Sequence, residues 1–117
     1  PIQKAAIAAL NGPLESVQEQ CRMYQERRDA LCNGLREIGW DLPNGKGTMF
    51  VWAKIPEGYE SSADFCIRLM ERTGVIVTPG SAFGSEGEGY VRMALVVDEQ
   101  MIAEIIRVLD ESGIFKD

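Results

Sequence analysis

The first third of the chain has apolar residues at helical spacing. Four alanines between residues 5 and 9 favour a short first helix, which the sequence Asn11-Gly12-Pro13 interrupts. Pro13 suits the first turn of a second helix, and Gly39 is a typical C-terminal stop. Between them, a stripe repeats at intervals of three and four and predicts a helix over 14–38: Leu14, Val17, Cys21, Tyr24, Arg28, Leu31, Leu35 and Ile38.

This second helix is long for the size of the chain. At about 1.5 Å per residue it would extend about 37 Å, whereas a compact domain of this length is about 35 Å across. We therefore expect it to span the whole domain and to project beyond it. The stripe also resembles a coiled-coil seam, but Arg28 interrupts it. An amphipathic helix packed on a sheet is the favoured interpretation, and a dimerisation coil is the alternative.

The rest of the chain alternates between strand and helix signals. Residues 48–55 are rich in β-forming residues, and Pro56 ends the run. Ser61 or Ser62 can cap a helix that ends at Gly74, with an inner face of Phe65, Cys66, Leu69 and Met70.

Beyond Gly74 the pattern predicts two more strands and a last helix. Residues 75–77 predict a short buried strand, 78–88 a long glycine-rich loop, and 89–97 another strand. Asp98 caps a helix that stops at Gly113 and buries Met101, Ile102, Ile105, Ile106 and Leu109. The order α-α-β-α-β-β-α predicts an α+β two-layer domain, a small antiparallel or mixed sheet covered by helices.

Composition limits the chemistry. The chain has 117 residues, enough for one core, and its 12 basic against 18 acidic residues disfavour nucleic acid as a partner. No apolar run approaches the length of a membrane span. Histidine is absent, which excludes histidine-based triads and dyads and most zinc sites. The 3 cysteines form no C-x-x-C motif, and we expect reduced thiols in a cytoplasmic protein.

Arg92 is the most informative single residue. It lies in a strand that is otherwise apolar, on the face shared by Tyr90, Ala94 and Val96. A guanidinium among such neighbours requires an anion, and its planar fork suits a carboxylate. The alternative is an arginine on a solvated sheet face, or one that protects an edge strand from aggregation.

Other candidate features indicate less. The loop 78–89 is long and glycine-rich, which favours a mobile or site-shaping segment over a plain connector. A phosphate cradle is disfavoured because the loop leads into a strand and carries Glu86 and Glu88. Lys46 lies in a glycine-flanked loop, where nothing would lower its pKa for nucleophilic catalysis. The cluster Arg22, Arg27 and Arg28 alternates with acidic residues, which predicts a solvated helix face.

Three segments together resemble the C-terminal small domain of class I/II aminotransferases, which are pyridoxal-phosphate enzymes of fold type I. The segments are Thr73–Gly84 (Thr-Gly-Val-Ile-Val-Thr-Pro-Gly-Ser-Ala-Phe-Gly), Gly87–Leu95 (Gly-Glu-Gly-Tyr-Val-Arg-Met-Ala-Leu) and Lys46–Trp52 (Lys-Gly-Thr-Met-Phe-Val-Trp). The resemblance covers essentially all of the chain, 1–117, and is greatest to the branch of LL-diaminopimelate, aspartate and alanine aminotransferases.

The resemblance assigns a role to Arg92, the clamp for the α-carboxylate of an amino-acid substrate. It implies that the 78–89 loop and the 46–50 segment help to close the active site, and that the 14–38 helix connects a large and a small domain. The family's Schiff-base lysine and its aspartate partner of the cofactor belong to the large domain, and no stretch here matches them. We therefore expect no catalytic, cofactor-binding or metal-binding residue in this chain.

These points imply that the chain is part of a longer transaminase, consistent with its start at Pro1 directly in a helix. The parent protein is expected to be a cytoplasmic homodimer that binds pyridoxal 5'-phosphate and exchanges an amino group between an amino acid and a 2-oxo acid. The fragment alone is expected to be inactive and to bind the cofactor only weakly. The alternatives are a free-standing, non-catalytic amino-acid-binding module, in which Arg92 binds a carboxylate, and a purely structural domain.

Overall fold

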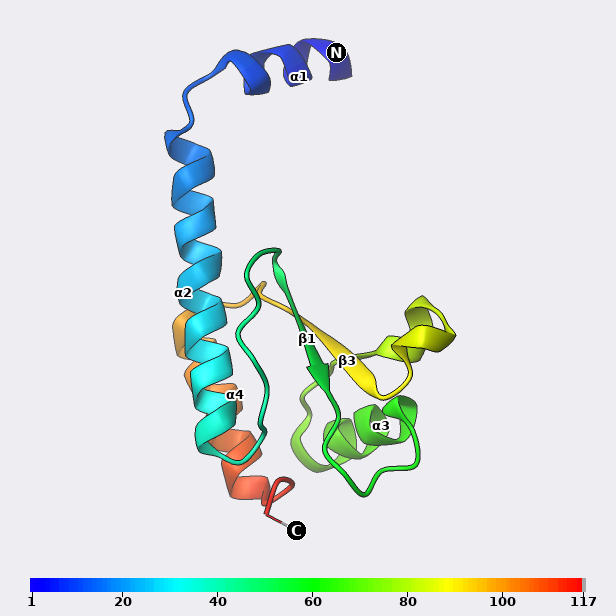
Figure 1. The fold of residues 1–117 in the computed structure, drawn as a ribbon. Coiled ribbons are helices and arrows are strands. Elements are labelled where there is room, and N and C mark those ends of the chain that lie inside the picture. Colours follow the sequence, from blue (N-terminus) through cyan, green and yellow to red (C-terminus); the bar gives the residue numbers. More distant parts are fainter. Residues whose placement is uncertain (117) are drawn as a thin grey trace.

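The computed structural model describes residues 1–116 and has the predicted α+β architecture (Figure 1). Its helices and strands follow the predicted order: α1 (Ile2–Asn11), α2 (Glu15–Glu37), β1 (Phe50–Lys54), α3 (Ser62–Thr73), β2 (Thr78–Pro79), β3 (Tyr90–Ala94) and α4 (Glu99–Ser112). Two short 3-10 turns, Gly80–Phe83 and Ser85–Gly87, separate β2 from β3. The 3 strands form an antiparallel sheet in the order β1-β3-β2, so β3 is the central strand.

The helix predicted over 14–38 is present as α2, and it projects from the domain. The described residues extend 52 × 32 × 23 Å, because only the last part of α2 packs on the rest of the protein, while α1 has no buried residue (Figure 1). The buried side chains of α2 are Leu31, Cys32 and Leu35. At Gly39, φ is +110°, and the amide of Trp40 donates to the carbonyl oxygen of Leu35, as in a Schellman C-cap.

The core lies between one face of the sheet and helices α2, α3 and α4. Strict alternation buries Val51 and Ala53 of β1 and Val91 and Met93 of β3. Trp40 anchors the loop after α2, since its ring packs edge-on against a core phenylalanine and its indole N–H donates to the Lys54 carbonyl oxygen at 2.9 Å. Helices therefore cover one face of the sheet, and no helix within residues 1–116 covers the other face.

Helix-capping residues act as predicted. The Ser61 side chain accepts a hydrogen bond from the Asp64 amide at the start of α3, and Asp98 accepts one from the Met101 amide at the start of α4. Gly74 and Gly113 end these helices in the left-handed conformation. These boundaries depend on local hydrogen bonds, which explains why sequence patterns locate them.

The prediction of a buried strand at 75–77 is wrong. The strand begins at Thr78, and Ile76 is 78% exposed. The Val75 amide donates to the side-chain oxygen of Thr73 at the end of α3, so it is not available to a sheet ladder. The strand predicted over 89–97 is also shorter, since β3 covers Tyr90–Ala94, although the Leu95 amide still donates to the Met49 carbonyl oxygen.

Two further expectations about side chains are wrong. Met70 and Met101 were expected on the inner faces of their helices, but both are exposed. Arg27 and Arg28 do not form a solvated face, since both are half-buried and donate to carbonyl oxygens of Leu95 and Gly45, at 2.9 and 2.8 Å. These two arginines join α2 to loops at the end of the sheet.

Candidate functional site: an arginine on the open face of the sheet

Arg92 lies at the middle of the uncovered sheet face. It is half-buried on central strand β3, and its backbone is in register with Trp52 of β1 on one side and Thr78 of β2 on the other. The alternation predicted for this strand is confirmed, because its neighbours Val91 and Met93 point into the core. A role in protecting an edge strand is excluded by this central position.

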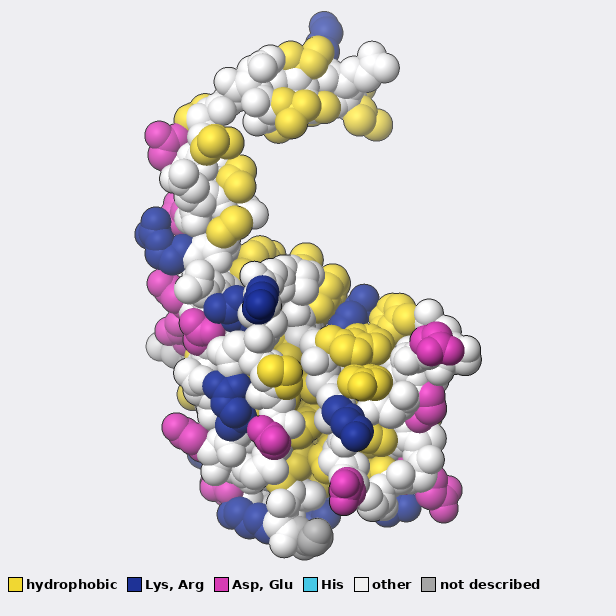
Figure 2. Space-filling view, in the orientation of Figure 1, with side chains coloured by type: hydrophobic (Ala, Val, Ile, Leu, Met, Phe, Trp, Pro, Cys, Tyr) yellow, Lys and Arg dark blue, Asp and Glu magenta, His cyan; other side chains and the backbone are white. Residues whose placement is uncertain are grey.

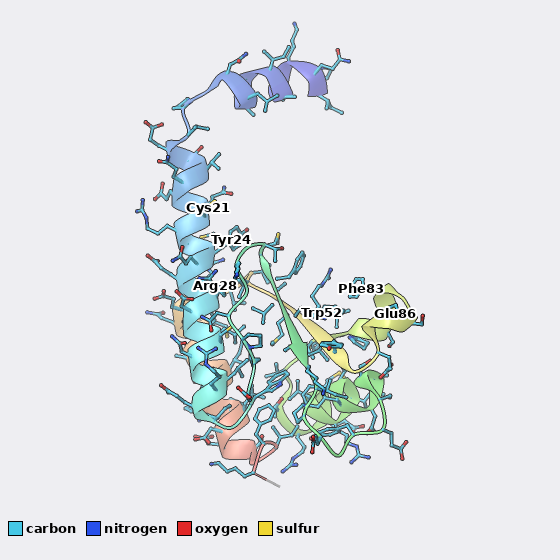
Figure 3. All side chains as sticks on the ribbon, in the orientation of Figure 1. Cys21, Tyr24, Arg28, Trp52, Phe83 and Glu86 are labelled. Carbon is cyan, nitrogen blue, oxygen red and sulfur yellow. The ribbon has the colours of Figure 1, made fainter. Side chains whose placement is uncertain are left out.

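Aromatic rings surround the guanidinium group. Its Cζ atom lies 4.2 Å from the centroid of the Phe50 ring and 4.5 Å from that of the Phe83 ring. Trp52 stacks on Tyr90 with the ring centroids 5.6 Å apart, and meets Phe83 edge-on at 6.3 Å. Figure 2 shows hydrophobic side chains gathered over β1 and β3, and Figure 3 shows Trp52 and Phe83 on the same side of the sheet.

The charge on Arg92 is not neutralised within residues 1–116, where its guanidinium makes neither a hydrogen bond nor an ion pair. Burial of this arginine against a protein carboxylate would support the alternative of a structural domain, but the described residues place no carboxylate there. A half-desolvated guanidinium with free N–H donors can bind an anion.

Two glycines close the loop that carries Phe83. The backbones of Gly80 and Gly87 touch, so that a Cβ on Gly80 would lie only 2.1 Å from the Gly87 carbonyl oxygen and 2.9 Å from the Trp52 ring. Gly84, with φ of +127°, joins the two 3-10 turns in a conformation that favours glycine. The predicted long loop is thus a compact, closed structure, which supports the interpretation of a site-shaping segment.

Glu88 fastens the end of this loop to α3. Its carboxylate accepts hydrogen bonds from the amide of Ser62 at 2.6 Å and from the side-chain hydroxyl of Ser62 at 3.2 Å. The hydrogen bond from the Ser62 amide lowers the pKa of the Glu88 carboxyl, and the hydrogen bond from the Gly89 amide lowers it to a smaller extent. The first turn of α3, where an anion would be favoured, therefore already binds the carboxylate of Glu88.

The segment before β1 borders a separate cavity of about 350 Å³. Cys21, Tyr24 and Arg28 of α2 line it (Figure 3). Lys46 and Thr48 also belong to its lining. Lys46 is exposed. Thr48 has a φ of +67°, which is unusual for a β-branched residue and gives this segment a sharply defined turn.

Comparison with known proteins assigns the family. The sequence profile of the family "Aminotransferase class I and II" matches residues 1–109. The chain belongs to the class I and II aminotransferases. The resemblance found in the sequence is thereby confirmed.

Relatives of this aminotransferase chain are considerably longer. It is 47% identical over 113 residues to the LL-diaminopimelate aminotransferase of Halothermothrix orenii, covering 97% of this chain and 29% of that protein. It is 46% identical over 108 residues to the enzyme of the same name from Moorella thermoacetica, covering 92% of this chain and 27% of that protein. The chain thus spans less than a third of the length of these relatives.

Solved structures agree with this assignment. The substrate-bound structure of BacF from Bacillus subtilis matches with a TM-score of 0.86 and 38% identity, covering 93% of this chain and 28% of that one. The alanine aminotransferase of Pyrococcus furiosus matches with a TM-score of 0.83 and 27% identity, covering 92% and 28%. The fold of this chain therefore recurs within longer proteins of known structure, among them an alanine aminotransferase.

The lysines of the chain lie at its surface. Lys4, Lys46, Lys54 and Lys116 are all exposed. Of the helices within residues 1–116, none combines the length and the apolarity that a membrane crossing requires. The three cysteines have free thiols, and burial raises the pKa of Cys32 and Cys66.

Sequence analysis identified Arg92 but missed the residues that shape its surroundings. Phe50 and Phe83 contact Arg92, and Gly80, Gly87 and Glu88 hold the loop in place. Phe50 does share the outward face of β1 with Trp52, so the alternation of that strand was an available signal. Nothing in the local sequence indicates that Phe83 returns to β3.

Proposed function

We propose that this chain is the C-terminal small domain of a transaminase and that Arg92 binds the α-carboxylate of the amino-acid substrate or the 2-oxo acid. The observation that supports this most is the half-buried guanidinium on the open sheet face, bordered by rings and without an acidic partner among residues 1–116. A substrate carboxylate offers two coplanar oxygens to the guanidinium fork and neutralises its charge.

The large domain, which this proposal assigns to the parent protein, supplies pyridoxal 5'-phosphate. That cofactor provides an electron sink for the substrate carbanion when it is bound. All four lysines here are exposed, so this proposal assigns the Schiff-base lysine to the large domain. The part of this chain is to bind the carboxylate at Arg92 and to exclude water with the 80–87 turns. We expect the isolated chain to be inactive, and the parent to be a cytoplasmic homodimer, as the family resemblance implies.

Carboxylate binding can be measured on the 117-residue chain itself. We expect alanine and acetate to bind in the millimolar range and to shift the side-chain N–H signal of Arg92 in NMR spectra. Arg92→Ala should weaken this binding by about tenfold or more, because a charge-assisted pair is lost. Arg107→Ala is the matched control, since Arg107 is an exposed arginine that pairs with Glu104 and Glu111 on α4. Equal binding by wild type and Arg92→Ala would contradict the assignment of Arg92.

Cofactor binding gives a second test. Pyridoxal phosphate added to the isolated chain should give no absorption band that responds to amino acids, whereas a native polypeptide several times longer should be yellow and should change colour with amino acids. A colourless native protein of 117 residues would favour the alternative, a free-standing amino-acid-binding module. Both functions use the same Arg92 site.

A further inference from the structure

The guanidinium of Arg92 is covered by rings that come from two different flanks. Phe50 belongs to β1, on one side of central strand β3, and Phe83 belongs to the turn that follows β2, on the other side. Both rings lie with their faces toward Cζ, at 4.2 and 4.5 Å. Within residues 1–116, the Phe83 ring packs against the Trp52 ring but makes no ring contact with Phe50. The two phenylalanines therefore meet only through Arg92.

This arrangement limits how an anion can approach. All N–H donors of a guanidinium lie in its plane, whereas its two faces are attracted to aromatic rings. An orientation with the guanidinium faces toward the Phe50 and Phe83 rings, which this attraction favours, leaves the edge of the plane as the route to the donors. A planar carboxylate can use that edge with two parallel hydrogen bonds, but a spherical anion such as chloride cannot.

The position of Phe83 is not explained by burial in the core. Its side chain is 53% exposed and does not belong to the core cluster. The turn is held by the backbone contact between Gly80 and Gly87 and by the Trp52 ring against Gly80. The loop therefore places an exposed aromatic ring on Arg92, at a position where solvent would otherwise be.

We propose that Phe83, together with Phe50, is a positioning residue that holds the plane of the Arg92 guanidinium and makes the site selective for planar carboxylates. This inference rests on the proposed function of Arg92 and adds the origin of its selectivity. Phe83 acts through Arg92 and is not itself a ligand of the carboxylate.

The test compares three variants of the 117-residue chain by NMR titration with acetate and, separately, with chloride. In the wild type, ring currents should move the Arg92 side-chain signals upfield, and acetate should bind more tightly than chloride. Phe83→Leu keeps an apolar side chain but removes the ring; it should abolish part of the upfield shift, weaken acetate binding by about threefold or more, and reduce the preference for acetate. Phe83→Tyr should restore all three properties. Ile76→Leu is the control, since Ile76 is an exposed apolar residue that contacts no guanidinium.

The outcomes separate this inference from the proposed function. If Phe83→Leu keeps the affinity and the selectivity of the wild type while Arg92→Ala loses binding, the positioning role is wrong and the carboxylate site stands. If the wild type shows no acetate binding, both are wrong. Phe50→Leu provides a second variant with the same expected losses, so the result does not depend on the behaviour of the 80–87 turns alone.

Discussion

The close contact between the backbones of Gly80 and Gly87 predicts that a side chain at either position would disrupt the loop. In Gly80→Ala, the new Cβ would lie 2.1 Å from the Gly87 carbonyl oxygen and 2.8 Å from that of Tyr90. An ordinary van der Waals contact begins at 3.4 Å, so the backbones at 80 and 87 must separate by about 1.3 Å. Because both obstacles are backbone atoms, no side-chain rotation can relieve the clash.

We expect this displacement to cost about 1–3 kcal/mol of stability, the usual range for overpacking, and to remove Phe83 from Arg92. Urea unfolding would measure the stability, and NMR titration with acetate would measure binding at Arg92. Gly87→Ala should behave in the same way, because its Cβ would lie 2.1 Å from the Gly80 carbonyl oxygen.

Gly47→Ala is the matched control, since a Cβ there meets no atom within 4 Å and its φ is not in the left-handed region. We expect its stability to change by no more than about 0.5 kcal/mol and its acetate binding to equal that of the wild type. If Gly80→Ala and Gly47→Ala gave the same unfolding midpoint and the same acetate affinity, the closed-loop description would be refuted.

Two further predictions concern the core and the loop attachment. Leu35→Ala should lower the free energy of unfolding by about 2–5 kcal/mol, since Leu35 is fully buried, whereas Leu10→Ala on exposed α1 should change it by less than about 0.5 kcal/mol; similar losses in the two urea titrations would contradict the core assignment. Glu88→Gln should be less stable than the wild type at pH 7, because the folded state lowers the pKa of Glu88 below its ordinary value of 4.5. That difference should be present above pH 4.5 and should diminish as the pH falls through the lowered pKa, so a difference that stays constant from pH 7 to pH 3 would show that the Glu88 charge is not involved.

Much of the fold could be predicted because its signals are local. The stop at Gly39 and the caps at Ser61 and Asp98 depend on hydrogen bonds within a few residues. The order of elements and the projecting α2 followed from periodicity and length alone. Alternation along β3 also singled out Arg92, because one charged residue in an apolar strand is conspicuous whatever the rest of the chain does.

Non-local packing explains where the predictions were wrong. Arg27 and Arg28 alternate with acidic residues, yet both donate to loop carbonyl oxygens, and Arg27 reaches one that lies 68 positions away. Residues 75–77 are strong β-formers, but the register of β2 with β3 begins at Thr78. The β-propensity of a short segment is a weak guide to strand position where the pairing register with the neighbouring strand determines which residues join the sheet.

By itself, the sequence determined the class of fold, the helix ends and the one arginine suited to a carboxylate, because each of these depends on neighbours along the chain. Tertiary structure alone decided what surrounds that arginine. Phe50 and Phe83 precede Arg92 by 42 and 9 positions in the chain, and Glu88 reaches Ser62 across 26 positions. Such contacts arise only when the three strands pair in the order β1-β3-β2 and bring distant segments onto one face of the sheet.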